Sequence, residues 1–158
     1  MRSGLPLSKL KQSKFPYPAI QPVCLRHRLF RLTAPYSVEL KAPFLKKKFG
    51  RPMRIDIPEG MLTDGASIDE LAALMVGGPT DPSNLIPGVI HDYLFCKDCT
   101  GDAALLTFDE CNQVFCYIIE VDAFHNFISR ELMHKAIDRF GKPHFRTAGI
   151  FDTCIAKD

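Results

Sequence analysis

The chain has 158 residues, of which 46% are hydrophobic and 24% are charged, and these values are typical of one soluble globular domain. A chain of this length can bury a core without metal ions or disulfide bonds. No apolar run is long enough to cross a bilayer, and the first 20 residues lack the continuous apolar stretch of a secretory signal. We therefore expect neither membrane insertion nor a signal peptide.

The charge is divided unevenly along the chain. Residues 1–50 contain eleven Lys and Arg and one acid, Glu39, which gives +10. Residues 51–158 contain nine Lys and Arg and seventeen Asp and Glu, which gives −8. A basic segment joined to an acidic body can bind nucleic acid, an acidic protein surface or a neighbouring copy of the chain. Its aromatic residues do not follow a base-stacking pattern, so nucleic acid is the secondary expectation.

Residues 1–28 form the first predicted unit, an extended basic arm. The segment combines scattered prolines and basic residues with little periodicity, a composition that disfavours a packed core. Prolines also lower the entropy that the arm loses when it is laid out on a partner. The side chains expected to contact that partner are Arg2, Lys9, Lys11, Lys14, Arg26 and Arg28.

The next segments predict strands. Residues 29–32, 36–40 and 54–57 alternate apolar and polar side chains, as half-buried strands do. A turn is predicted immediately after the last of them, at Pro58-Glu59-Gly60.

The rest of the chain predicts helices. Ser67 and Glu70 have the spacing of a capping box and open a short helix that ends at Gly77-Gly78; residues 85–95 have helical apolar spacing. Thr107 and Glu110 form a second capping box, which starts a helix that ends near residue 121, and a last helix covers residues 123–140.

Strands followed by helices predict an α+β fold, with a small antiparallel sheet packed by three to four C-terminal helices and an extended basic N-terminal arm. The expected units are the arm (1–28), the core (29–145) and a C-terminal tail (146–158). The side chains expected to be fully buried are Ile90, Phe115, Ile119, Phe127 and Phe140.

Four cysteines allow a zinc interpretation, because Cys96 and Cys99 have the Cys-x-x-Cys spacing of a metal site and Cys111 and Cys116 follow. Within a helix, however, the latter two would diverge by about 140°, which is poor geometry for one tetrahedral ion. We favour the interpretation that these are reduced, partly buried thiols.

Two short segments concentrate polar groups that can exchange protons or bind metal. Thr63 and Asp64 follow a predicted strand, and His91 and Asp92 lie 27 and 28 residues after Asp64 in a predicted helix rich in apolar residues. Asp64 could be a metal ligand, a general base or a residue that caps its own turn, and Ser67 is best explained as a helix cap. His91 and Asp92 are about 100° apart on a helix, so they point to different sides.

The same segments carry a resemblance. Residues 57–68, with the sequence Ile-Pro-Glu-Gly-Met-Leu-Thr-Asp-Gly-Ala-Ser-Ile, and residues 89–95, with the sequence Val-Ile-His-Asp-Tyr-Leu-Phe, resemble a family of small bacteriophage and bacterial proteins without an established activity. The resemblance extends over about residues 29–145. On their motifs, the family members look like metal-dependent hydrolases.

The resemblance implies a site with two departures. Asp64, His91 and Asp92 are the implied catalytic residues and, with Asn112, the implied ligands of a divalent metal ion. Asp69 stands where the family has Pro, and Asn112 stands where it has Asp. An amide oxygen is a weaker ligand than a carboxylate for a hard cation, and it cannot transfer a proton.

Two functions are expected, in this order. The first is a bacteriophage virion protein, of the tail, that is assembled in the host cytoplasm and docks through its arm onto other virion subunits or copies of itself. The second is a metal-assisted hydrolase that acts on the cell wall or another host polymer. The arm, the charge asymmetry and Asn112 favour the first function, and the intact motifs around Asp64 and His91 favour the second.

Overall fold

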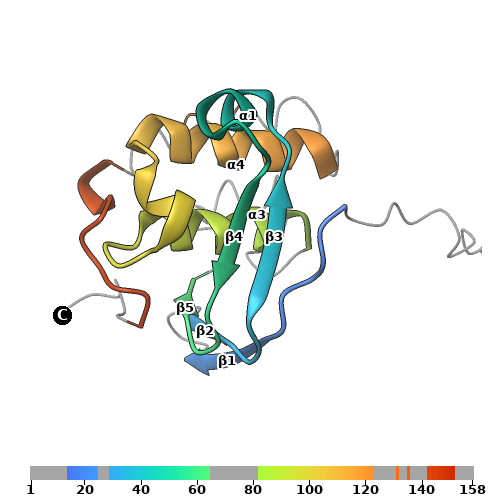
Figure 1. Ribbon diagram of the computed structural model, residues 1–158. Helices are drawn as coiled ribbons and strands as arrows, with labels where there is room; N and C mark the ends of the chain where they lie inside the picture. Colours follow the sequence, from blue (N-terminus) through green and yellow to red (C-terminus); the bar gives the residue numbers. More distant parts are fainter. Residues whose placement is uncertain are drawn as a thin grey trace, which may run out of the picture.

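The computed structural model shown in Figure 1 describes residues 14–24, 29–64, 82–122 and 142–151, together with Glu131 and Lys135. The fold is α+β, as predicted, with small antiparallel sheets and helices that lie mostly in the C-terminal half. None of the helices in these ranges has both the length and the apolar character that a bilayer crossing requires.

The first sheet has three antiparallel strands in the order β1 (Ile20–Cys24), β2 (Leu29–Leu32) and β5 (Leu62–Thr63). β1 lies within the range predicted to be an arm, but it pairs with β2 along its length. It is an edge strand, the position in a sheet where a proline such as Pro22 is tolerated. Residues 20–24 of the predicted arm therefore belong to a sheet, and residues 1–13 and 25–28 lie outside the described part of the chain, so the arm itself stays a prediction.

The second sheet consists of β3 (Tyr36–Leu40) and β4 (Met53–Ile57), paired antiparallel over their full lengths. Every second residue of each strand is buried, as the alternation predicted. The prediction of a single sheet was wrong, because β2 pairs with β5 instead of joining β3 and β4. β5 has only two residues, too few for an alternating pattern to be recognised.

The connection between β3 and β4 contains a helix that was not predicted, α1 (Pro43–Phe49). It ends at Gly50, whose φ of 72° suits glycine, and its basic last turn complements the helix dipole. Lys48 and Arg51 form ion pairs with Glu110 and Asp102, both at 2.7 Å, and these pairs attach the connection to the helical part of the molecule.

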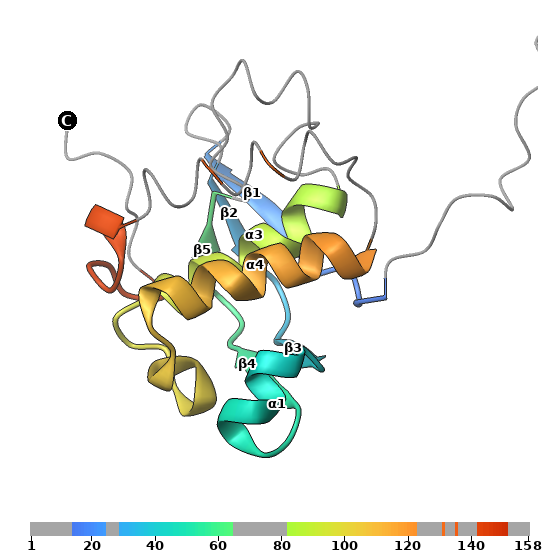
Figure 2. The ribbon, with the colours of Figure 1, turned by 90° about the horizontal axis from the view of Figure 1, so that it is seen from above.

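Two predicted helices are confirmed as α3 (Pro82–Phe95) and α4 (Phe108–Asp122), which pack side by side (Figures 1 and 2). The predicted capping box of α4 is present: Thr107 N–H donates to Glu110 Oε2 at 2.8 Å, and Glu110 N–H donates to Thr107 Oγ1 at 3.3 Å. The predicted helix that starts at Ser67 lies outside the described residues. So does most of the helix predicted over residues 123–140, where Glu131 and Lys135 are helical.

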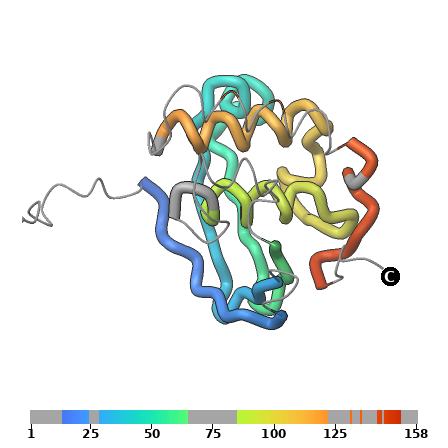
Figure 3. The backbone as a smooth tube through the Cα atoms, turned by 180° about the vertical axis from the view of Figure 1, so that it is seen from behind, coloured from blue at the N-terminus to red at the C-terminus, as the bar shows by residue number. Residues whose placement is uncertain are grey.

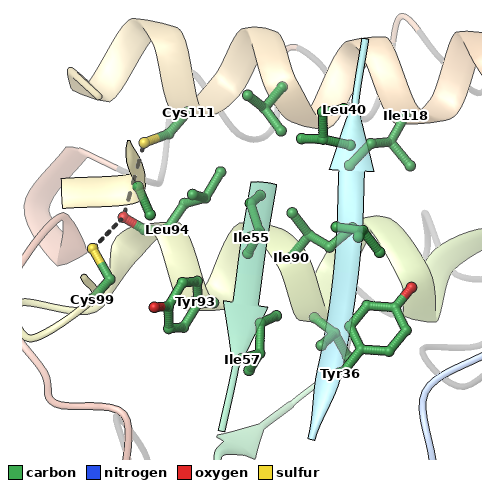
Figure 4. Close-up of a cluster of buried hydrophobic side chains, with 14 of the residues drawn as sticks. Tyr36, Leu40, Ile55, Ile57, Ile90, Tyr93, Leu94, Cys99, Cys111 and Ile118 are labelled. Carbon is green, nitrogen blue, oxygen red and sulfur yellow. Dashed lines mark hydrogen bonds between the residues drawn. The ribbon is translucent and has the colours of Figure 1, made fainter. Parts of the chain in front are cut away.

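The core lies between the β3–β4 sheet and the two long helices (Figure 4). Side chains from both strands face Ile90 and Leu94 of α3 and Ile118 of α4. Burial of Ile90, Phe115 and Ile119 is confirmed, with exposed fractions of 0%, 3% and 3%. The other two predicted core residues, Phe127 and Phe140, lie outside the described side chains.

Residues 142–151 run along one end of the molecule (Figure 3) and include a short 3-10 helix, η3 (Lys142–His144). They pass close to a second 3-10 helix, η2 (Gly101–Leu105), and Ile150 belongs to the core. Residues 146–158 were predicted to be a C-terminal tail; within the described part of this range, Arg146, Ala148 and Ile150 are hydrogen-bonded to the body of the protein. The pattern contained no strand or helix signal because these bonds are made by an irregular backbone.

Candidate functional site

The candidate site lies where the end of β5 meets the last turn of α3. Thr63 is 2% exposed, and its Oγ1 donates a hydrogen bond to Asp92 Oδ2 at 2.6 Å. The carboxyl group of Asp64 is hydrogen-bonded to that of Asp92, and the backbone N–H of Asp64 also donates to Asp92. Both carboxyl groups are only partly exposed. Groups of Thr63, at the end of β5, and of Asp64, which follows it, therefore converge on one carboxyl group of α3.

Neighbouring segments hold β5 on both sides. On one side, Phe30 and Arg31 of β2 pair with Thr63 and Leu62. On the other, the N–H of Leu62 donates to the carbonyl oxygen of Ile150 at 3.1 Å. Because β5 has two residues, these few hydrogen bonds fix the position of Thr63 and Asp64 against α3.

Electrostatics make Asp92 the unusual member of the site. Burial raises the pKa of Asp92 well above its usual range, and the neighbouring Asp64 carboxylate raises it further. The hydrogen bonds from Thr63 and from the Asp64 backbone act in the opposite direction without cancelling the rise. Asp92 therefore keeps its proton at pH values at which an exposed aspartate is ionised.

His91 lies on a different face of α3, against α4. Its Nε2 is 3.0 Å from Oδ1 of Asn112, which is 2% exposed. Because a carbonyl oxygen can only accept, Nε2 carries the proton in this pair. The imidazole ring lies 4.1 Å from the ring of Phe95 and 5.2 Å from that of Phe115, centroid to centroid.

This apolar setting keeps His91 uncharged. Burial lowers the pKa of His91 to about 4, although the hydrogen bond to Asn112 acts in the opposite direction. At neutral pH the ring is therefore neutral and cannot serve as a proton donor of ordinary strength. The aromatic cluster continues from Phe95 to Phe108 and Phe145 at ring distances of 5.3–5.8 Å.

The structure thus brings the predicted site residues together in two pairs. Asp64 lies with Asp92, and Asn112 lies with His91, on faces of α3 separated by one residue step. Within the described ranges, no three His, Cys, Asp or Glu side chains form a group that could hold a metal ion. A metal-binding role for Asp64, His91, Asp92 and Asn112 stays a prediction.

The predicted partner-binding residues fall mostly outside the described ranges. Lys14 is described and exposed, at the start of the segment that leads to β1. The others are Arg2, Lys9, Lys11, Arg26 and Arg28, and their role also stays a prediction.

The cysteines considered as zinc ligands surround the end of α3. Cys96, Cys99 and Cys111 are buried, and Cys116 is partly buried. The thiols of Cys99 and Cys111 both point to the carbonyl oxygen of Leu94, at 4.0 and 3.9 Å (Figure 4). Burial raises the pKa of Cys99 and brings that of Cys111 to about 12, so both are protonated at neutral pH. A thiol in this state is a poor nucleophile.

Sequence reasoning did not predict two sets of contacts at and near the site, those of Thr63 and those of Arg146. Thr63 was noted as a hydroxyl near Asp64, but its bond to Asp92 depends on the pairing of β5, which no local pattern indicates. Arg146, in the predicted tail, makes several hydrogen bonds around the end of α3. The (i, i+4) spacing of His91 and Phe95 was the one available signal for the aromatic contact.

Comparisons with curated proteins and with solved structures gave no match to the chain. A model of a protein family does match, over residues 38–137, which is more than half of the chain. The matched range is narrower than the resemblance expected from the motifs, but it includes β4, β5, α3 and α4, and with them Asp64, His91, Asp92 and Asn112. The chain belongs to the family described as proteins of unknown function, DUF1353.

Proposed function

We propose that the Asp64–Asp92 pair is the acid–base centre of a hydrolase. The observation that carries this proposal is the contact between two partly buried carboxyl groups, one of which, that of Asp92, has a pKa raised well above its usual range by burial and by its neighbour. The burial of two adjacent carboxyl groups destabilises the folded protein. Perturbed carboxyl groups of this kind are concentrated at functional sites.

The two carboxyl groups suit complementary roles. Asp92 holds the proton, because burial and the adjacent carboxylate both favour its neutral form. Asp64 accepts a proton from a water molecule, whose oxygen attacks the carbonyl carbon of the substrate. Asp92 donates its proton to the nitrogen or oxygen of the leaving group, the bond between that atom and the carbonyl carbon breaks, and the proton taken up by Asp64 then returns to Asp92. Thr63 orients the Asp92 carboxyl group through its hydrogen bond to Oδ2.

The closeness of the pair favours an acyl substrate, that is, an amide or ester. Glycosidases keep their two carboxyl groups roughly 5–9.5 Å apart, to accommodate either a covalent intermediate or a water molecule beside the sugar. A hydrogen bond between two carboxyl groups brings one oxygen atom of each within about 2.5–3 Å of the other, which leaves no room between them for a sugar or a water molecule. Peptide bonds of the cell wall or of another host polymer are therefore the proposed targets.

The experiment uses purified peptidoglycan and a denatured protein as substrates. Release of free amino groups is measured beside release of reducing sugar ends. We expect new amino groups without reducing ends, and a loss of activity of about 100-fold or more in Asp92→Asn and in Asp64→Asn. New reducing ends would contradict the substrate class, and no release of either product would contradict the hydrolase.

Asp56 provides the matched control. It is an exposed carboxylate that accepts a hydrogen bond from Ser37 Oγ at 2.6 Å, the same length as the Thr63–Asp92 bond. Asp56→Asn should leave activity unchanged. Addition and removal of divalent metal ions separates the acid–base mechanism from the metal-assisted one. Activity that persists in a chelator supports the acid–base pair, and activity that requires an added ion supports the metal-assisted mechanism.

We propose virion assembly as a second function, because the charge of the chain is so sharply divided. The +10 of residues 1–50 and the −8 of residues 51–158 favour head-to-tail contacts between copies or with an acidic subunit of a phage tail. β1 ties the end of the arm to the sheet, so a partner held by the preceding residues would be held close to the body.

The test removes residues 1–13 alone, which leaves β1 intact. We expect the truncated protein to stay folded but to be lost from virions, where mass spectrometry of the complete protein should show a fixed copy number. A variant with Arg2, Lys9 and Lys11 changed to Gln keeps the length of the arm and should behave like the truncation. Normal incorporation of both variants would contradict docking through the arm.

A further inference from the structure

Residues 142–151, which we call the C-terminal strap and which run along one end of the molecule (Figure 3), are hydrogen-bonded to α3, which carries Asp92, and to β5, which directly precedes Asp64. At the end of α3, Arg146 N–H donates to the carbonyl oxygen of Phe95 at 2.8 Å. In the loop that follows, Lys97 N–H donates to the carbonyl oxygen of Ala148 at 2.9 Å, and the Ile150 N–H donates to Asp98 Oδ1 at 2.8 Å. The strap therefore follows the end of α3 over several residues.

The same strap reaches β5. The N–H of Leu62 donates to the carbonyl oxygen of Ile150 at 3.1 Å, so Ile150 is bonded to β5 through its carbonyl and to Asp98 through its N–H. Thr63 and Asp64 follow Leu62 directly. The strap is therefore bonded both to β5 and to the end of α3, and it connects the segments that carry Asp64 and Asp92.

Arg146 anchors the strap. Its guanidinium group donates to the carbonyl oxygens of Ala103 at 2.8 Å and of Cys96 at 3.3 Å, and it also bonds the thiol of Cys99. Its backbone has a φ of 60°, the left-handed region that a side chain of this kind rarely adopts. A residue stays in that conformation only where its surroundings determine it, and here five hydrogen-bond partners do so, since Arg146 also donates to the carbonyl oxygens of Phe95 and Leu106.

We propose that Arg146 is a positioning residue for the Asp64–Asp92 pair, acting through the strap and Leu62; the catalytic meaning of this role rests on the hydrolase proposed above. β5 has two pairs with β2 and one bond to the strap, so the loss of the strap removes the support on one whole side. A hydrogen-bonded pair of carboxyl groups is sensitive to displacements of about 1 Å.

Both supports of β5 come from outside the residues that match the family. The match covers residues 38–137, whereas β2 lies before this range and the strap lies after it. The family match thus contains the pair itself, and the flanking segments of this chain hold it in place.

Amide hydrogen exchange measured by NMR tests the proposal. In Arg146→Gln, the Leu62 amide should exchange about tenfold faster or more, while Val38 and Ile55 of the β3–β4 sheet should change little. The ¹³Cγ resonance of Asp92 should shift in the same variant. Asp98→Ala, which removes the other anchor of Ile150, should produce the same local pattern if Arg146→Gln fails to fold.

Arg51→Gln is the control, because Arg51 also binds the η2 region, through Asp102, but does not touch the strap. It should leave both signals unchanged, and Arg146→Lys, which keeps the charge, should give an intermediate effect. Equal acceleration at Leu62, Val38 and Ile55 would reduce Arg146 to a general stabilising residue and overturn the proposal, as would an unmoved Asp92 resonance. These measurements need no substrate, so their outcome is independent of whether the hydrolase assay succeeds.

Discussion

Asp92 and His91 are adjacent residues of α3, but they lie on different faces of the helix. The Asp92 face meets β5, and the His91 face meets α4. Burial disfavours the charged form of both side chains, so it raises the pKa of Asp92 and lowers the pKa of His91. The partners differ: Asp92 has a second carboxyl group beside it, whereas His91 has the uncharged amide of Asn112. A retained proton next to a proton acceptor is the arrangement that acid–base chemistry needs, and only the Asp92 face has it within the described residues.

The other face has the properties of a structural contact. His91 is neutral at physiological pH, lies between two phenylalanine rings and is hydrogen-bonded to a buried amide. Polar groups that are satisfied in this way specify the packing of α3 on α4. We therefore expect mutations on the His91 face to act on stability alone, and mutations on the Asp92 face to act also on the ionisation of the Asp92 carboxyl group.

The largest expected effect is on the His91 face, from Phe115→Ala. Phe115 is 3% exposed and contacts the His91 ring edge-on, so its removal leaves a cavity between α3 and α4. We expect the free energy of unfolding to fall by about 3–5 kcal/mol, measured by urea denaturation.

Phe151 is the matched control, because it is the same residue type but is 60% exposed. Phe151→Ala should cost less than about 1 kcal/mol. A loss of that small size for Phe115→Ala as well would show that the helix register is wrong and that the His91 face is loosely packed.

The next effect concerns pH and His91. The folded protein binds a proton at His91 only near or below the pKa of about 4, whereas the unfolded chain does so below about 6.5. The unfolded state therefore takes up more protons between these values, and the free energy of unfolding falls as the pH is lowered through this window. The contribution of His91 should reach about 3 kcal/mol at pH 4.

His91→Gln isolates this contribution, because glutamine does not titrate. The stability difference between wild type and variant should shift in favour of the variant as the pH falls from 7 to 4. A difference that does not depend on pH would mean that the His91 ring is accessible and ordinary. Asp92 contributes in the opposite direction, because its raised pKa destabilises the folded state as the pH rises through it.

Local patterns in the sequence predicted the elements with enough residues to show a period. α3, α4 and the strands β2, β3 and β4 follow apolar spacing and a capping box, and they are found at nearly the predicted positions. α1 and β5 are too short for a period, and β1 resembles an arm because an edge strand tolerates proline.

The site was predicted in part, for a related reason. The 100° step between His91 and Asp92 follows from helix geometry, and it correctly predicted that they point to different sides. The pairing of Asp64 with Asp92, and of His91 with Asn112, depends on which elements pack against α3. Such long-range packing, like the approach of Arg146 to the end of α3, leaves no spacing signal in the chain.

A smaller change, Asn112→Asp, would make the two faces more alike. It replaces the amide group, whose Oδ1 lies 3.0 Å from Nε2 of His91, with a carboxylate. We expect the pKa of His91 to rise from about 4 by about 1–3 units, because an opposite charge favours the imidazolium form. NMR titration of the ring protons measures this rise.

Gln113→Glu is the control for Asn112→Asp, since it adds the same charge to the exposed side of α4. It should move the pKa of His91 much less. Calorimetry with a divalent metal ion should show tighter binding to Asn112→Asp than to wild type if the predicted metal site includes this position. Unchanged binding would leave His91 and Asn112 as a structural pair.

The smallest expected effect is on the Asp92 face, from Thr63→Val. The change keeps the shape of the side chain but removes the hydroxyl that donates to Asp92 at 2.6 Å, at a cost of about 1–2 kcal/mol. Because this hydrogen bond favours the ionised carboxyl group, its loss should raise the pKa of Asp92 further. The cost should therefore be larger above the pKa of Asp92 than below it, and urea denaturation at several pH values measures it.

Ser37→Ala removes a hydrogen bond of equal length to the exposed Asp56 and should cost less than about 0.5 kcal/mol. Equal costs for the two variants would mean that Asp92 is as well solvated as Asp56, and the Asp92 face would then lose the one property that sets it apart from an ordinary surface carboxylate.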